Sequence, residues 1–345
     1  MPGVFRYANP GTIRWGEGSV AELATEVERL GGRHPALVST RSVLAQPELV
    51  EDLRPEPVAT IAISQHTPIG EVRAAAERVR ESGADSLVSV GGGSAVDAAK
   101  LIGIIAGRGA ALPHVAVPTT LSVAELASGA GFTDEDGDKA GRGDPRMLPG
   151  AVIYDARLAV RTPIELWLST GVRALDHAVE GYLANGANPF SDVLCLEAVR
   201  RLFRTLPLAR DRPNDPAIRT ENQIAAWLSY PLPEAAGGLS HVMGKQIGAR
   251  HGIPHGFTSC LLLPHVMRYR ASRQPERMAE LSRATGAGGG PLAAADDVEA
   301  LIEGLGLRRT LAAWGVEEPD LRRAVDALAG EHSADDLLDI YRQAG

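Results

Sequence analysis

A run of glycines in the first third of the chain has the residue types of a phosphate-binding turn. Residues 86–90 (SLVSV) are apolar and partly β-branched, residues 91–94 read GGGS, and residues 95–106 continue as an apolar helix that carries Asp97 and Lys100. Glycine has no Cβ, so the backbone N–H groups of such a turn can approach a phosphate, and the amino end of the following helix favours negative charge. This order predicts a pyrophosphate site, with an ordinary tight turn as the alternative.

Two threonines follow the next strand of the same region. Thr119 and Thr120 come directly after Pro118, which ends the β-branched run 114–118. Open α/β sheets bind ligands at the carboxyl ends of their strands, so we expect both hydroxyls at the edge that carries the glycine turn. The glycines depart from the G-x-G-x-x-G pattern, and an ordinary Rossmann fingerprint is therefore not indicated.

The elements that must position these residues change character near the middle of the chain. Short apolar runs at 36–40, 59–64, 86–90 and 114–118 predict strands, and 69–82 has the spacing of an amphipathic crossover helix. After residue 155 the chain is rich in Ala and Leu, with predicted helices at 163–183, 189–206 and 257–269 and predicted loops at 251–256 and 286–295. We therefore expect a doubly wound α/β domain over 1–160 and an all-helical domain over 161–345, with the active site in the cleft between them.

Composition narrows the class of protein. The chain has 345 residues, 44% of them hydrophobic, and a formal net charge of −8, which disfavours a nucleic-acid or anionic-membrane partner. The two cysteines, Cys195 and Cys260, exclude a disulfide scaffold and lack basic neighbours that would activate them, so we expect them to pack. With neither a signal-like amino terminus nor a membrane-spanning run, a cytoplasmic location is expected.

Several separated motifs together resemble the iron-containing (group III) alcohol dehydrogenase family. They are the GGGS turn with Asp97 and Lys100, then Pro118, Thr119, Thr120 and Glu125. Residues 141–149 (GRGDPRMLP) and 152–155 (VIYD) resemble the maleylacetate reductase branch of that family. The resemblance covers nearly the whole chain and implies a Rossmann-like amino-terminal domain, an all-helical carboxyl-terminal domain of the dehydroquinate synthase-like type, and a homodimer.

The resemblance also implies NADH or NADPH as cofactor. Gly92, Gly93 and Ser94 would hold its pyrophosphate, and the nicotinamide end would lie near Asp97, Thr119, Thr120 and Lys139. Family members restricted to NAD often have an Asp at the end of the first cofactor strand, where this chain has Ser39, Thr40 and Arg41. Without that carboxylate, and with Arg41 present, we expect NADPH to be tolerated.

The resemblance implies that, in metal-dependent members of the family, an Asp and three histidines hold iron or zinc. The histidines correspond to His177, His241 and His255, but Arg173 stands at the position of the Asp, one helical turn before His177. A guanidinium about 5 Å from a dication would be repelled by roughly 6 kcal/mol at an effective dielectric near 20. Asp176 lies on another face of the helix, so we expect no catalytic metal, and a zinc or iron site on the three histidines is the alternative.

Lys245 stands where the family commonly has a further histidine, so both departures add positive charge. Cations bind carboxylates and stabilise oxyanions, so Arg173 and Lys245 favour a small anionic enone or ketone substrate, unless they are ordinary surface cations. Hydride addition to an enone leaves an enolate, for which His241 or His255 is the expected proton donor. A zinc or iron alcohol dehydrogenase, and a non-redox lyase, cyclase or inactive cofactor-binding protein, are the alternatives.

Overall fold

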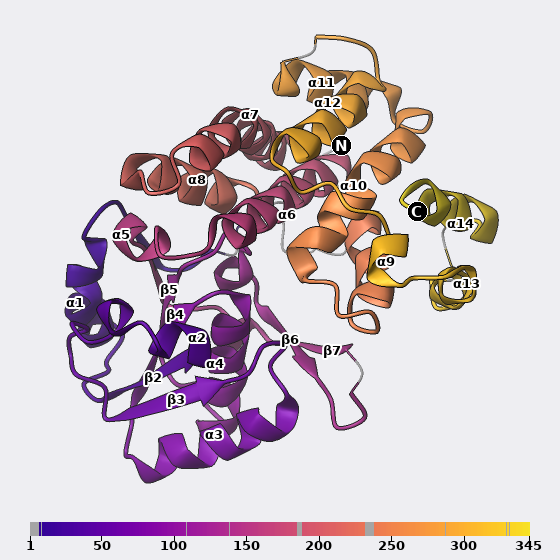
Figure 1. Ribbon diagram of the computed structural model, residues 1–345. Coiled ribbons are helices and arrows are strands. Elements are labelled where there is room, and N and C mark those ends of the chain that lie inside the picture. Colours follow the sequence, from indigo (N-terminus) through magenta and orange to yellow (C-terminus); the bar gives the residue numbers. More distant parts are fainter. Residues whose placement is uncertain are drawn as a thin grey trace. The chain divides into compact units, whose positions relative to one another are not determined.

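The computed structural model (Figure 1) describes residues 7, 9–107, 109–137, 139–184, 188–231, 238–286, 288–328, 330 and 332–345. The chain divides into two compact units. The sheet unit comprises Asn9–Thr162 and Asn214–Gln223, and the helical unit comprises Met1–Ala8, Pro163–Pro213 and Ile224–Gly345. Residues 214–223 therefore group with the sheet unit, which a single boundary near residue 160 does not anticipate.

A parallel sheet forms the centre of the sheet unit. Its strands are β1 (Thr12–Trp15), β2 (Pro35–Thr40), β3 (Ala59–Ile63), β4 (Ser86–Gly91), β5 (His114–Pro118) and β8 (Ala151–Tyr154). They lie in the order β1-β8-β5-β4-β2-β3, and every neighbouring pair is parallel. The four predicted strands are confirmed. Strands β1 and β8, which extend the sheet beyond β5, were not predicted.

Helices cover both faces of this sheet. Ala36 and Val38 of β2 pack in one apolar cluster with α3 (Ile69–Glu81) and α4 (Gly93–Ala106). Leu37 points the other way and packs in a second cluster with α1 (Leu23–Arg29) and α2 (Arg41–Leu44). Because alternate residues of a strand face opposite sides, both faces need cover, and the predicted doubly wound arrangement is confirmed.

A β-hairpin and several short turns complete the sheet unit. Strands β6 (Gly129–Thr133) and β7 (Lys139–Gly143) pair antiparallel in a separate two-stranded sheet, visible beside α4 in Figure 1. The short elements are η1 (Ser19–Glu22), η2 (Pro47–Leu49), η3 (Ala124–Leu126), η4 (Pro145–Met147) and α5 (Ala156–Ala159). The hairpin was not predicted, and it carries Lys139 at the start of β7.

The helical unit contains helices and no strand among its described residues. Its helices are α6 (Ile164–Leu183), α7 (Pro189–Asp211), α9 (Leu239–Gly248), α10 (His255–Ala271), α11 (Pro275–Thr285), α12 (Ala293–Gly304), α13 (Glu318–Asp326) and α14 (Ala334–Gln343), with the short turn η6 (Ala312–Trp314). The helix α8 (Pro216–Leu228) begins in residues of the sheet unit and ends in residues of the helical unit. Within the described chain, none of these helices has the length and hydropathy that crossing a bilayer requires.

Helix boundaries correct the sequence analysis at functionally important places. His255, predicted to lie in a loop, is the first residue of α10, because Pro254 has an extended conformation (φ −58°, ψ 141°) and serves as the N-cap. Helix α7 continues past residue 206 to Asp211, although Pro207 lies inside it. The predicted loop 286–295 is partly helical, since α12 begins at Ala293, and residue 287 lies outside the described residues.

Candidate functional site

The glycine turn lies at the carboxyl end of β4, directly before α4. Gly91 has φ 142°, a left-handed conformation that glycine adopts without steric cost. Its carbonyl oxygen accepts a hydrogen bond of 2.8 Å from the N–H of Thr119, and a Cβ built on Gly92 would lie 3.0 Å from Cγ2 of Thr120. The structure therefore brings the glycine turn and the two threonines together at one edge of the sheet, as predicted.

The amino end of α4 has the features of an anion site. Gly92 is the N-cap and no side chain caps the helix, so the first N–H groups of α4 have no partner within it. The Oγ of Ser94 accepts a hydrogen bond of 3.2 Å from the N–H of His66, and the Thr67 hydroxyl donates to the Ser94 carbonyl at 3.2 Å. These residues fit the pyrophosphate of a dinucleotide, because the donors and the helix dipole point to one place.

The β6–β7 hairpin joins Asp97 and Lys139 to the same region. Asp97 Oδ2 accepts a hydrogen bond of 3.0 Å from the N–H of Gly131, and Lys139 Nζ donates to Thr133 Oγ1 at 3.3 Å. Burial raises the pKa of the Asp97 carboxyl, and the ammonium of Lys100 opposes that rise. The charge of Lys139 also opposes the rise at Asp97, so these two predicted residues share one electrostatic environment. His66, which the sequence did not indicate, belongs to it too, because burial and then the charge of Lys139 lower its pKa.

The three residues predicted at the adenosine end lie where β2 ends, with Ser39 and Thr40 as its last two residues and Arg41 directly after it. Ser39 is fully buried, and its hydroxyl donates a hydrogen bond of 2.6 Å to the carbonyl of Val90. Thr40 Oγ1 lies 3.1 Å from Ser42 Oγ, and Arg41 is exposed as the first residue of α2. Ser39 therefore fixes β2 against β4, which leaves Thr40 and Arg41 as the groups that a ligand can reach.

Gly92→Val is expected to weaken NADH binding about tenfold or more, because a branched side chain at this position presses against Thr120 and moves the N–H groups of the turn. Isothermal titration with NADH measures the effect. Gly70→Val, at a position with open space in α3, is the control for a substitution that meets no neighbour. Equal affinities for the Gly92 variant and the parent protein would exclude the turn as the pyrophosphate site.

Three histidines gather in the helical unit. The ring centroids of His177 and His241 are 6.1 Å apart, and those of His241 and His255 are 5.2 Å apart. The ring of Tyr230 lies 5.1 Å from that of His177, edge to face. Every residue of α6 from Trp167 to Leu183 is buried except His177, which is partly exposed, as is His241, while His255 is exposed. The imidazoles of α6, α9 and α10 thus form one accessible cluster, as predicted.

A buried ion pair lies on α6, the helix that carries His177. The side chain of Arg173 is 3% exposed and that of Asp176 is 1% exposed, and Arg173 Nη1 donates to Asp176 Oδ2 at 3.0 Å. The hydroxyls of Ser240 and Ser259 donate to the same carboxylate oxygen at 3.1 and 2.6 Å. Burial lowers the pKa of His177 well below its ordinary range, and the charge of Arg173 adds to this, so His177 is neutral at pH 7.

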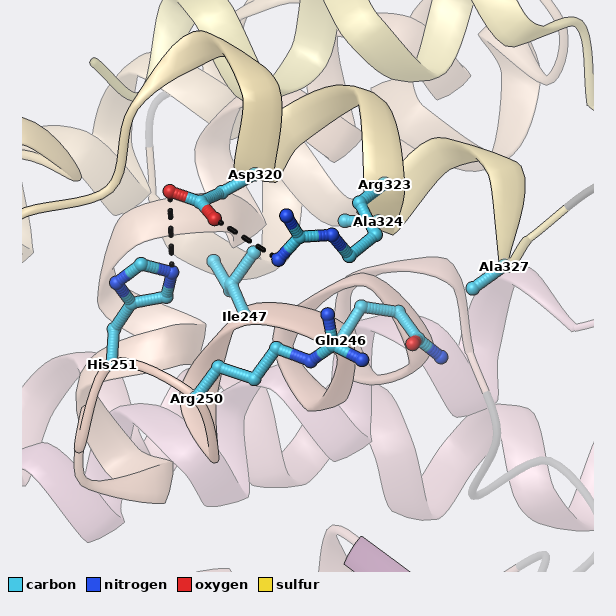
Figure 2. A pocket seen from close by; sticks show the side chains of 8 residues that line it. All are labelled: Gln246, Ile247, Arg250, His251, Asp320, Arg323, Ala324 and Ala327. Atoms are coloured by element: carbon cyan, nitrogen blue, oxygen red, sulfur yellow. Dashed lines mark hydrogen bonds and ion pairs between the residues drawn. The ribbon is translucent and has the colours of Figure 1, made fainter. Parts of the chain in front are cut away.

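The two predicted cations are not equivalent. Arg173 is buried and paired, so its interpretation as a surface cation is wrong, whereas Lys245 is exposed near the carboxyl end of α9. Figure 2 shows a pocket between the end of α9 and α13, with Gln246 and Arg250 on its wall. The pocket contains none of the predicted site residues, and His251 and Arg323 both face Asp320 in it.

The described residues do not fit a metal site. No group of three or more His, Cys, Asp or Glu side chains in the described parts of the chain has the geometry to hold an ion. The only carboxylate adjacent to the histidines in sequence, Asp176, has its Oδ2 bonded to Arg173, Ser240 and Ser259. A buried guanidinium beside His177 also disfavours a second positive charge there, so no catalytic step is assigned to a metal.

Sequence reasoning named Lys100 as part of a motif without a role, and it missed two serines that support the site. Lys100 is buried and donates to the carbonyls of Ala124, Ala127 and Gly129 at 2.5, 2.7 and 2.8 Å, which fixes the segment after Thr120. Ser240 and Ser259 gave no signal, because their common partner is distant in sequence. The pairing of Arg173 with Asp176 had a signal, since residues three apart on a helix are neighbours.

The two cysteines behave as packing residues, and two further histidines lie outside the cluster. Cys195 and Cys260 are buried, and burial raises the pKa of the Cys195 thiol to about 12 and that of Cys260 further, as expected for unreactive cysteines. His114 is buried beside Ser89, and burial lowers the pKa of His265. Neither histidine belongs to the cluster of His177, His241 and His255.

Comparisons with known proteins agree with this fold. Residues 10–156 match the model of the iron-containing alcohol dehydrogenases, and residues 167–337 match the C-terminal model of the same family. A maleylacetate reductase of Sphingobium indicum is 34% identical over 317 residues, which are 91% of this chain and 88% of that protein. Maleylacetate reductase 2 of Cupriavidus pinatubonensis is 34% identical over 308 residues, 88% of this chain and 84% of that protein.

Solved structures with a similar fold come from the same kinds of protein. A putative alcohol dehydrogenase from Ralstonia eutropha is 34% identical with a TM-score of 0.90 and covers 100% of this chain and 98% of its own. The maleylacetate reductase of Agrobacterium tumefaciens, 28% identical with a TM-score of 0.87, has the same coverage. The protein is thus an NAD(P)-dependent oxidoreductase. It belongs to the iron-containing alcohol dehydrogenase family, on the branch that contains the maleylacetate reductases.

Proposed function

We propose that this reductase delivers hydride from NADH or NADPH to a small carboxylate-bearing enone or ketone, without a catalytic metal. The observation that carries the proposal is the buried pair of Arg173 and Asp176 on the helix of His177, together with the cluster of three imidazoles, in a chain 34% identical to a maleylacetate reductase. A guanidinium at this place disfavours a dication, and the imidazoles of His241 and His255 can exchange protons with a substrate.

The chain's own residues divide the work between binding and proton transfer. When bound, the reduced nicotinamide supplies the hydride. Gly92, Gly93 and Ser94 hold the cofactor's pyrophosphate, and Asp97, Thr119, Thr120 and Lys139 line the way to its nicotinamide. Exposed Arg41 donates hydrogen bonds to a 2′-phosphate, so NADPH can be used in addition to NADH.

In the helical unit, His241 or His255 donates a proton to the α-carbon of the enolate that forms when hydride adds to the β-carbon of the enone. The electron pair of the C=C bond becomes the new C–H bond at the α-carbon, and water returns the proton to the imidazole. His177 is not the proton donor, because burial and Arg173 keep it neutral. It donates or accepts a hydrogen bond to the substrate, while exposed Lys245 attracts its carboxylates.

The proposal includes a cytoplasmic location and a homodimer. Its support is the pair of unreactive, unbridged cysteines, which suit a reducing compartment, and the family resemblance. Light scattering of the purified protein tests the dimer.

Oxidation of NADH and NADPH in the presence of maleylacetate is the test of the reaction. We expect turnover with both cofactors that survives a strong chelator, in protein that contains less than stoichiometric zinc or iron. Loss of activity to the chelator and its return with added metal would instead identify a metal-dependent alcohol dehydrogenase. Tight NADH binding without turnover of any enone, ketone or aldehyde would identify a non-redox or inactive member.

A further inference from the structure

One carboxylate oxygen joins the three helices that carry the histidine cluster. Asp176 Oδ2 accepts hydrogen bonds from Arg173 of its own helix α6, from Ser240 of α9 and from Ser259 of α10. Ser259 Oγ also accepts from Arg173 Nη1 at 3.1 Å, so the four side chains form one closed network, here called the Asp176 cluster. All four residues are buried.

Each of the three clustered imidazoles lies within four residues, in sequence, of a member of the Asp176 cluster. Arg173 precedes His177 by four residues on α6, and Ser259 follows His255 by four on α10, so each pair shares a helix face one turn apart. Ser240 directly precedes His241 at the start of α9. Helix α6 therefore contributes two residues to the buried network, α9 and α10 contribute one each, and every one of these helices carries one imidazole of the accessible cluster.

A second contact on the same side fixes α9. Glu180 of α6 accepts a hydrogen bond from the backbone N–H of Ser240, and a Cβ on Gly238 would overlap the Glu180 carboxyl. Residue 238 therefore has to be glycine for the two helices to approach this closely. The first turn of α9, which holds His241, is thus bonded to α6 through both its backbone and its side chain.

We propose that the Asp176 cluster positions His177, His241 and His255 for the reduction, as a coordinated ion would in a metal-dependent relative. Imidazoles on three separate helices need a common anchor, and a buried carboxylate with directional donors from each helix provides one. Asp176, Ser240 and Ser259 are positioning residues, since none of them reaches the surface that a substrate contacts. The inference rests on the proposed function for its kinetic part only.

Ser259→Ala and Ser240→Ala test the proposal, because each removes one link between helices and leaves the ion pair in place. We expect kcat with maleylacetate to fall roughly tenfold or more, while KM for NADH changes less than about twofold, since displaced imidazoles impair chemistry rather than cofactor binding. In the NADH-free protein, the imidazole nitrogen signals of His255 in the first variant and of His241 in the second should shift.

Ser169→Ala is the matched control. Ser169 is also buried on α6, but its hydroxyl bonds to the carbonyl of Leu166 in the same helix, so its loss should change neither kcat nor the imidazole signals. Near-normal kcat or unchanged imidazole signals in both cluster variants would overturn the proposal. If the parent protein does not reduce maleylacetate, the proposed function fails, and the imidazole signals alone decide whether the cluster positions the histidines.

Discussion

Asp176→Ala is expected to lower the free energy of unfolding of the helical unit by about 3–5 kcal/mol, because it leaves the guanidinium of Arg173 buried without a counter-charge. It also leaves the hydroxyls of Ser240 and Ser259 without their acceptor, so the variant should be among the most destabilising single changes in this unit. Urea unfolding followed by tryptophan fluorescence measures the loss, since Trp167 is fully buried in α6 and reports on this unit.

The double variant Arg173→Met with Asp176→Leu removes both charges of the ion pair. Compared with Asp176→Ala, it distinguishes the net contribution of the pair to stability from the cost of leaving one charge buried alone. Apolar residues of similar size can replace a buried ion pair with little loss, so the double variant should be more stable than Asp176→Ala alone by at least about 1–2 kcal/mol. A loss below about 1 kcal/mol in Asp176→Ala would mean that water or a rearranged side chain compensates Arg173, which the buried geometry does not allow.

Acidification is expected to destabilise the sheet unit through His114. This side chain is 6% exposed at the start of β5, its Nε2 lies 2.8 Å from Ser89 Oγ, and burial lowers its pKa from 6.5 to about 3. His114 therefore stays neutral in the folded protein, whereas the unfolded chain binds a proton below its ordinary pKa. The stabilisation is complete above pH 6.5 and is lost as the pH falls toward 3.

Between about pH 7.5 and pH 5 this one group should remove about 2 kcal/mol of stability. His114→Asn retains a polar partner for Ser89 and has no titrating group at this position. Over the same pH interval the free energy of unfolding of this variant should therefore fall by about 2 kcal/mol less than that of the parent protein. Urea unfolding at both pH values measures the difference, and the other histidines with lowered pKa cancel because both proteins contain them. Parallel pH dependences of the two proteins would show that His114 is solvated in the folded state.

The sequence alone determined the class of fold and most of the residues now placed at the two sites. β-branched runs of five or six residues followed by an amphipathic segment have few other stable arrangements, so β2, β3, β4 and β5 and the crossover helix α3 could be predicted. The glycine turn was predictable from its glycines. The structure gives the physical reason, since Gly91 adopts φ 142°, where other residues are strained. The short strands β1 and β8 escaped prediction because four residues carry too little pattern.

Only the tertiary structure decided what Arg173 does. By spacing it lies on the face of His177, which suggested a cation available to a substrate, but its guanidinium is buried against Asp176 and Ser259. Ser240 and Ser259 lie 64 and 83 residues from Asp176 in the chain, so no local pattern could assign them to one carboxylate. Periodicity specifies which face of a helix a residue occupies, whereas the partner of a buried polar group depends on which other helices pack against that face.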